Sequence, residues 1–125
     1  MKRMRWMAAS MAALALAAAG AGASLIERAA AGQSGPANPF ANSEAARSAG
    51  AKLYARECAA CHGANREGGG KVPRLAQGEV FEAAPGSLFW ILRNGSLRRG
   101  MPSFAHLPEP MRWQIVTFLQ SRKSQ

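Results

Sequence analysis

From residue 43 onward the chain alternates between stretches with helical apolar spacing and stretches rich in Gly and Pro. Residues 43–57 carry apolar side chains on one helical face, and Ser43 is a good N-cap residue. A second helix, with Pro at its start and Asn-Gly at its end, is predicted over residues 85–94. A third is predicted over residues 111–122, where apolar positions recur at i, i+3 and i+4. No segment favours a strand, so we predict an all-α domain of three to four helices with long loops.

Gly50 lies inside the first predicted helix, where it costs about 1 kcal/mol of helix stability relative to Ala. Such a cost is easiest to understand if another backbone lies against it. We therefore expect a close helix crossing at Gly50.

The N-terminal residues 1–23 have the pattern of a secretory signal peptide. Three basic residues precede an Ala-rich apolar stretch, and Ala21-Gly22-Ala23 offers a cleavage site. The alternative is an uncleaved membrane anchor, because residues 6–26 contain no charge and reach spanning length. Either way we expect the remainder outside the cytoplasm, in the periplasm. Residues 24–42 have the composition of a flexible linker, so the predicted domain is 43–125.

The chain carries a formal net charge of +9, from 16 Lys and Arg against 7 Asp and Glu. Three of the positive charges lie in the predicted leader, and without them the net charge is 13 minus 7, or +6. A charge of this size favours solubility and steering toward acidic partners. No basic run interleaved with aromatic residues accompanies it, so nucleic-acid binding is not indicated.

The two cysteines, Cys58 and Cys61, are followed at once by His62, which is the c-type haem attachment pattern. Two thiols at this spacing reach the two vinyl groups on one edge of a porphyrin, and the next side chain can turn under the ring to bind iron. Three alternatives remain: a thioredoxin-like redox pair, a zinc site that also uses His106, or a disulfide. The redox pair would need a βαβ pattern, which the sequence lacks. The zinc site would have to use the adjacent Cys61 and His62, which suit a tetrahedral site poorly, and the disulfide would close too small a loop to stabilise the fold much.

A domain of about eighty residues has a marginal core and often needs a staple. A large apolar ring bonded to the chain at two points would enlarge the core and also cross-link the chain. We therefore expect that the protein made without haem lacks fixed tertiary structure.

Over residues 43–120 the sequence resembles the small class I cytochromes c. The first helix and attachment site match in Gly50-x-x-Leu53-Tyr54-x-x-x-Cys58-Ala59-Ala60-Cys61-His62-Gly63. The later elements match in Pro73-x-Leu75, in Arg93-Asn94-Gly95, in Gly100-Met101-Pro102 and in the terminal Ile115-Val116-x-Phe118-Leu119.

The resemblance implies a cytochrome c-like fold around one covalent haem c. It implies that Cys58 and Cys61 bind the haem, that the Pro73 carbonyl accepts a hydrogen bond from His62, and that Leu75 lies against the ring. It also implies that the terminal helix crosses the first helix at Gly50.

The sixth iron ligand is predicted to be Met101. Met101 lies in a loop between Gly and Pro, whereas Met111 lies in a regular helix and is expected to be a core or surface residue. His106 could ligate instead, but a lone His in a Pro-bounded loop is more often solvated. With His62 and Met101 both bound, iron has no open position, so we predict an electron carrier and no enzyme activity.

Five basic residues flank the two ligand loops and could form a collar that steers an acidic partner, or be ordinary solvated surface: Lys71, Arg74, Arg93, Arg98 and Arg99. Trp90 and Trp113 are expected to be core aromatic residues. Two motifs resemble cytochromes that accept electrons from periplasmic dehydrogenases and pass them to an oxidase or another cytochrome: Pro85-Gly86-x-Leu88-Phe89-Trp90 and Arg98-Arg99-Gly100-Met101-Pro102-Ser103-Phe104. The alternatives are a fixed electron-entry subunit of a dehydrogenase or oxidase complex, and a haem enzyme or gas sensor that lacks Met101 ligation.

Overall fold

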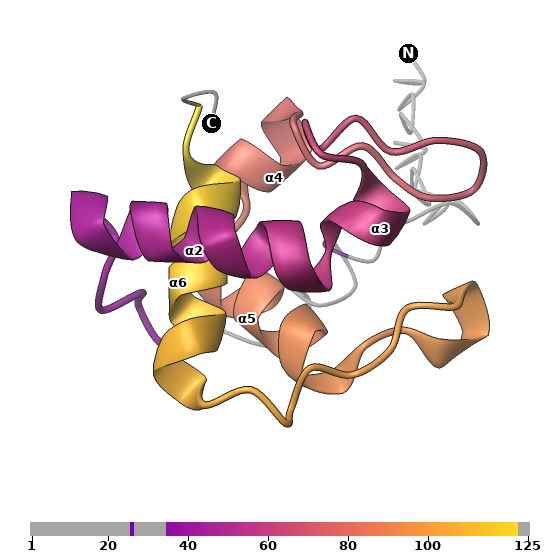
Figure 1. The fold of residues 1–125 in the computed structure, drawn as a ribbon. Helices are drawn as coiled ribbons and strands as arrows, with labels where there is room; N and C mark the ends of the chain where they lie inside the picture. The colour runs from indigo at the N-terminus through magenta and orange to yellow at the C-terminus, as the bar shows by residue number, and fades with distance from the viewer. Residues whose placement is uncertain (1–25, 27–34, 123–125) are drawn as a thin grey trace, which may run out of the picture.

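A computed structural model describes residue 26 and residues 35–122; the predicted signal peptide, residues 1–23, lies outside the described residues. The described chain forms α2 (Glu44–Glu57), α3 (Ala59–His62), α4 (Gly78–Glu82), α5 (Pro85–Asn94), a 3₁₀ turn (Leu97–Arg99) and α6 (Glu109–Gln120) (Figure 1). Within these residues there is no strand, and two isolated bridges are the only β-type pairings. The predicted all-α class is confirmed. None of the described helices has the length and apolar character needed to cross a membrane.

Helices α2 and α6 cross at a steep angle and form the centre of the fold (Figure 1). Gly50 lies at the crossing, where an added Cβ would overlap the backbone carbonyl of Gln114 and come within 2.9 Å of the Phe118 Cβ. The close approach expected at this glycine is therefore present. It brings the buried side chains of α2 onto those of α6, and Tyr54 and Phe118 meet with ring centroids 5.3 Å apart.

The helix ends follow local signals. The Ser43 hydroxyl accepts a hydrogen bond from the Ala46 N–H, as an N-cap does, and α5 covers the predicted residues 85–94. Helix α6 begins at Glu109, two residues before the predicted start, because Pro110 in its first turn needs no N–H partner. The short α3 and α4 were not predicted, since four or five residues are too few to show a period.

The core is built mainly from α2, α5 and α6. Trp113 is buried in it and stacks on Phe89 with ring centroids 4.0 Å apart. Trp90 is only half-buried and is not part of this cluster. The buried cluster consists of Leu53, Tyr54, Cys58, Val80, Leu88, Leu92, Phe104, Leu107, Trp113, Ile115, Val116, Phe118 and Leu119.

Residues 35–42, which have linker composition, lie against α5 and α6. The Asn38 amide donates a 2.9 Å hydrogen bond to the Thr117 hydroxyl, which in turn donates to the Phe40 carbonyl. Gly35 touches the backbone of Gly86 at the start of α5 so closely that a side chain on either residue would collide. Specific contacts from three residues thus hold a segment of low hydrophobicity on the domain.

Candidate functional site

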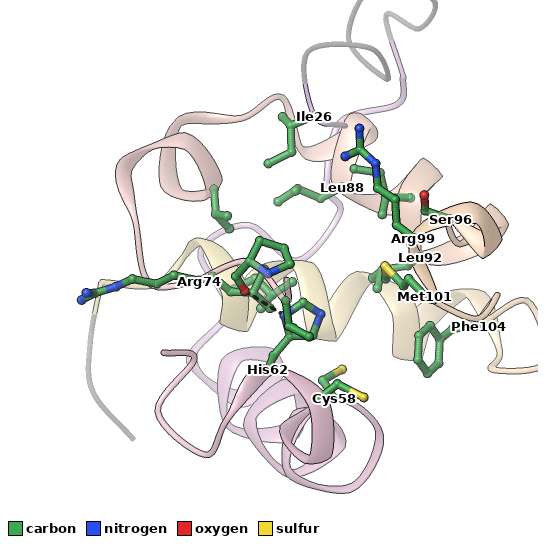
Figure 2. A pocket seen from close by; sticks show the side chains of 18 of the residues that line it. Ile26, Cys58, His62, Arg74, Leu88, Leu92, Ser96, Arg99, Met101 and Phe104 are labelled. Carbon is green, nitrogen blue, oxygen red and sulfur yellow. Dashed lines mark hydrogen bonds between the residues drawn. The ribbon is translucent and has the colours of Figure 1, made fainter. Parts of the chain in front are cut away.

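A cavity of about 360 Å³ opens on one side of the helical core. Figure 2 shows its lining side chains, which come from the α2–α3 corner, the loop after α3, helix α5 and the loop before α6. Most of its surface is apolar, and its apolar lining includes Val72, Pro73, Leu75, Val80, Leu88, Ile91, Leu92, Met101, Phe104 and Leu119. Ile26, from the N-terminal segment, also contributes to the lining. The volume and the apolar walls are typical of a site for an organic cofactor.

Both cysteines lie on the wall of this cavity. Cys58 is the C-cap residue of α2 and is buried, and Cys61 lies in the single turn of α3 and is exposed. The His62 N–H donates a 2.9 Å hydrogen bond to the Cys58 carbonyl, which keeps the attachment segment in a helical turn. Side chains three apart in such a turn face the same side. The thiols are free, as bonding to a porphyrin edge requires.

The His62 imidazole is oriented by a backbone carbonyl. Its Nδ1–H donates a 3.0 Å hydrogen bond to the Pro73 carbonyl oxygen, drawn as the dashed line in Figure 2. A proton on Nδ1 leaves the lone pair of Nε2 available to a metal, and the hydrogen bond increases the basicity of the ring. In Figure 2 the ring points into the cavity, toward the side where Met101 lies.

Met101 is held on the opposite wall by backbone pairing. Ser96 and Met101 exchange two hydrogen bonds of 2.9 and 3.0 Å between their N–H and carbonyl groups. Gly95, with a φ of 67°, lies so close to the Pro102 carbonyl that a Cβ would come within 2.7 Å of it. The Met101 side chain is half-buried and lines the cavity. Neither Met111 nor His106 lines the cavity, and both are exposed.

Tyr54 ties the attachment turn to helix α2. Its hydroxyl donates a 2.6 Å hydrogen bond to the carbonyl of Gly63, the residue after His62. Burial is the largest cause that raises the pKa of Tyr54 to about 12. The phenol is therefore a neutral donor under ordinary conditions.

Charged side chains of both signs line the cavity, three basic and two acidic. Lys71, Arg74 and Arg99 line the cavity, together with the carboxylates of Glu57 and Glu79. In Figure 2 the Arg74 side chain extends away from the cavity, and its Nε–H donates a 2.9 Å hydrogen bond to a backbone carbonyl. Two further members of the predicted collar, Arg93 and Arg98, are exposed but do not belong to the lining.

The side chains present fit a covalently bound haem. Two free thiols, an imidazole and a thioether sulfur meet at one apolar cavity, which is the donor set and the environment that haem c requires. Among the described residues, no three His, Cys, Asp or Glu side chains gather where they could hold a bare metal ion.

One residue of this region was missed by sequence reasoning. Arg66 stands in a Gly-rich loop, where an arginine normally points to solvent, yet it is buried beside α6. Nothing in the local sequence distinguishes it from an exposed residue, because its partners lie more than fifty positions away in the chain.

A family model described as "Cytochrome C oxidase, cbb3-type, subunit III" matches residues 45–119, more than half of the chain. No curated protein and no solved structure gives a match. The matched range contains both cysteines, both ligand candidates and every described residue of the cavity wall except Ile26.

Proposed function

Because the chain belongs to the cbb3-type cytochrome c oxidase subunit III family, we propose that it transfers electrons through one haem c with His62 and Met101 as axial ligands. Membership of the family shows a c-type cytochrome domain that binds haem c covalently and works in electron transfer. Such a domain is an electron carrier and not by itself a catalytic enzyme. The ligand pair and the partners are our proposal.

One observation carries the ligand assignment. The cavity that holds the two cysteines also receives the His62 imidazole from one wall and the Met101 side chain from the other. Among the described residues, the two other candidates for the sixth ligand are Met111 and His106, and neither lines the cavity.

Each residue has a distinct task in this proposal. Cys58 and Cys61 would hold the haem covalently and His62 would offer its Nε2 lone pair to the iron, while the Pro73 carbonyl keeps the imidazole oriented. Haem c supplies an iron that takes up and returns one electron. The soft sulfur of Met101 would favour the reduced state of that iron, and the mostly apolar wall would limit its contact with water. With His62 and Met101 both bound to the iron, no position would be left for a substrate or a gas.

Replacing the proposed sixth ligand tests the assignment. We expect Met101→Ala to abolish the weak sulfur-to-iron absorption band of the ferric protein and to let the ferrous protein bind carbon monoxide at neutral pH. Met111→Leu is the matched control, because it removes an exposed thioether outside the cavity and should leave both properties unchanged. Loss of the band in Met111→Leu, or its survival in Met101→Ala, would contradict the proposal.

We propose acidic redox proteins as partners, because three basic residues, against two acidic ones, line the cavity that would hold the haem. A periplasmic dehydrogenase as donor and an oxidase or another cytochrome as acceptor would fit. The N-terminal residues would act as an export signal, cleaved to release a free periplasmic carrier.

A fixed electron-entry subunit is the second candidate, and the description of the family as an oxidase subunit favours it. In that case the N-terminal residues would stay as a membrane anchor. Purification from the native host separates the two functions. A soluble protein that begins at Ser24 supports the free carrier, whereas co-purification with a large membrane enzyme supports the subunit.

A further inference from the structure

Arg66 has a backbone conformation that favours glycine. Its φ is 62°, and among the described residues it is the one non-glycine residue with a positive φ. A side chain in this region costs on the order of 1 kcal/mol and persists only where surrounding contacts hold it.

The Arg66 side chain provides such contacts. It is only 5% exposed, and its guanidinium donates hydrogen bonds to the carbonyls of Phe118, Leu119 and Ser121, at 3.4, 3.4 and 3.0 Å. These carbonyls are at the C-terminal end of α6, where a helix carries partial negative charge, so a guanidinium is favourable there. The guanidinium also lies 4.8 Å from the Phe118 ring centroid, within the range of cation–π attraction.

The backbone of the same residue closes the loop that approaches His62. The Arg66 carbonyl accepts hydrogen bonds from the N–H groups of Leu75 and Ala76, at 2.9 and 3.2 Å. The loop that begins at Arg66 therefore comes back to the Arg66 carbonyl at Leu75 and Ala76. Pro73 lies in the part of the loop just before this contact. Because the Pro73 carbonyl accepts from His62 Nδ1, the position of that acceptor depends on how firmly the base of the loop is fixed.

We propose that Arg66 is a positioning residue for the axial histidine: anchored on the end of α6, it holds the 66–76 loop so that the Pro73 carbonyl stays on His62 Nδ1. This role rests on the proposed function, in which His62 binds the haem iron. A firmly hydrogen-bonded imidazole is a stronger donor and favours ferric iron. Loosening the loop weakens that hydrogen bond and raises the reduction potential.

The sign of the potential shift separates this role from a simple charge effect. Loss of a positive charge near the haem favours ferric iron and lowers the potential, whereas loss of the loop anchor raises it. Arg66→Gly removes the side chain while it relieves the backbone, since Gly accepts a φ of 62°. Arg66→Lys keeps the charge but has no planar fork to bridge several carbonyls. Arg122→Gln is the control, because it removes an exposed positive charge that also lies over the Phe81 ring.

The test measures two properties of the haem-loaded variants: the midpoint potential and the hydrogen-exchange rate of the His62 Nδ1 proton in the ferrous state. For Arg66→Gly we expect a three- to tenfold rise in the ferrous-to-ferric ratio at fixed ambient potential, tenfold being about 59 mV, and exchange at least tenfold faster. Arg66→Lys should shift both in the same direction by less, and Arg122→Gln should leave the exchange rate unchanged.

A potential that falls or stays constant in Arg66→Gly, with exchange as slow as in the wild type, overturns the proposal. If Arg66→Gly yields no haem protein, Arg66→Lys decides by the same two measurements. Failure of the ligand assignment is recognised separately, since the wild-type ferric protein would then lack the sulfur-to-iron band.

Discussion

At the scale of single residues, Tyr54 shows how a core side chain controls the ligand segment. Its ring is fully buried against Phe118, while its hydroxyl reaches the carbonyl next to His62. Helix α6, helix α2 and the attachment turn therefore meet at one phenol. A change there should alter both stability and its pH dependence.

We expect Tyr54→Phe to lower the free energy of unfolding by about 1 kcal/mol at neutral pH, because one buried hydrogen bond is lost. The pKa of Tyr54 is raised to about 12 in the folded protein, so above pH 10 the unfolded chain loses this proton first. The contribution of Tyr54 is thus complete below pH 10 and is lost as the pH rises toward 12. Denaturant unfolding of both ferrous proteins from pH 8 to 11.5 measures this, and a difference that does not change with pH would count against it.

At the scale of elements, the crossing of α2 and α6 depends on Gly50. We expect Gly50→Ala to reduce the free energy of unfolding by about 1–3 kcal/mol, because the methyl group would overlap the α6 backbone. The gain of about 1 kcal/mol in helix propensity opposes this loss and does not cancel it. Thermal or denaturant unfolding gives the measurement.

Gly78→Ala is the matched control for this substitution. Gly78 is also in a helix, at the start of α4, but a methyl group added there would meet no atom within 4 Å, and its φ is not positive. We expect it to be neutral or slightly stabilising. Equal losses in the two variants would mean that the crossing does not set the cost.

The elements also show where sequence reasoning succeeds. Helices with two turns or more carry a period and recognisable ends, so α2 and α5 match their predicted ranges closely. The four-residue α3 and five-residue α4 carry no such signal. Their formation depends on neighbours: the attachment turn is held by Tyr54, and Gln120 of α6 donates a 2.7 Å hydrogen bond to the carbonyl of Ala83 after α4.

At the scale of the whole molecule, the cavity wall is a large share of the apolar interior. Leu88, Leu92 and Phe104 belong both to the buried core cluster and to the lining. A bound haem would fill the space beside these side chains and would connect the two ligand loops. Filling the cavity and folding the domain are therefore expected to be coupled.

Removing the haem tests this coupling. We expect the Cys58→Ser, Cys61→Ser protein, produced without haem, to lack cooperative thermal unfolding and near-ultraviolet circular dichroism, while the haem-loaded wild type shows both. The comparison must use proteins of the same length. A cooperative transition in the haem-free protein would mean that the helices alone suffice.

The basic side chains that line the cavity should govern the rate of reaction with anions. We expect Lys71→Glu with Arg99→Glu to slow reduction of hexacyanoferrate(III) by about tenfold at low ionic strength and to flatten the salt dependence. Lys52→Glu with Arg122→Glu makes the same charge change at exposed residues outside the lining. Stopped-flow mixing measures the rate for each double variant. Equal slowing by both pairs would mean that the net charge of the protein, and not the place of the charges beside the cavity, sets the rate.

The sequence alone determined what depends on neighbours in the chain. The Cys58-x-x-Cys61-His62 pattern predicts the haem, which the family confirms, because attachment chemistry needs only a fixed local spacing. Helical periods predicted the long helices for the same reason. These are properties that a short segment carries by itself.

The tertiary structure decided what depends on distant partners. It brought Met101, and neither Met111 nor His106, to the cavity that holds His62. It also buried Arg66, because its acceptors are carbonyls at the far end of the chain that local pattern cannot reveal. Contacts between residues far apart in sequence arise only when whole helices cross, and here that crossing occurs at a glycine.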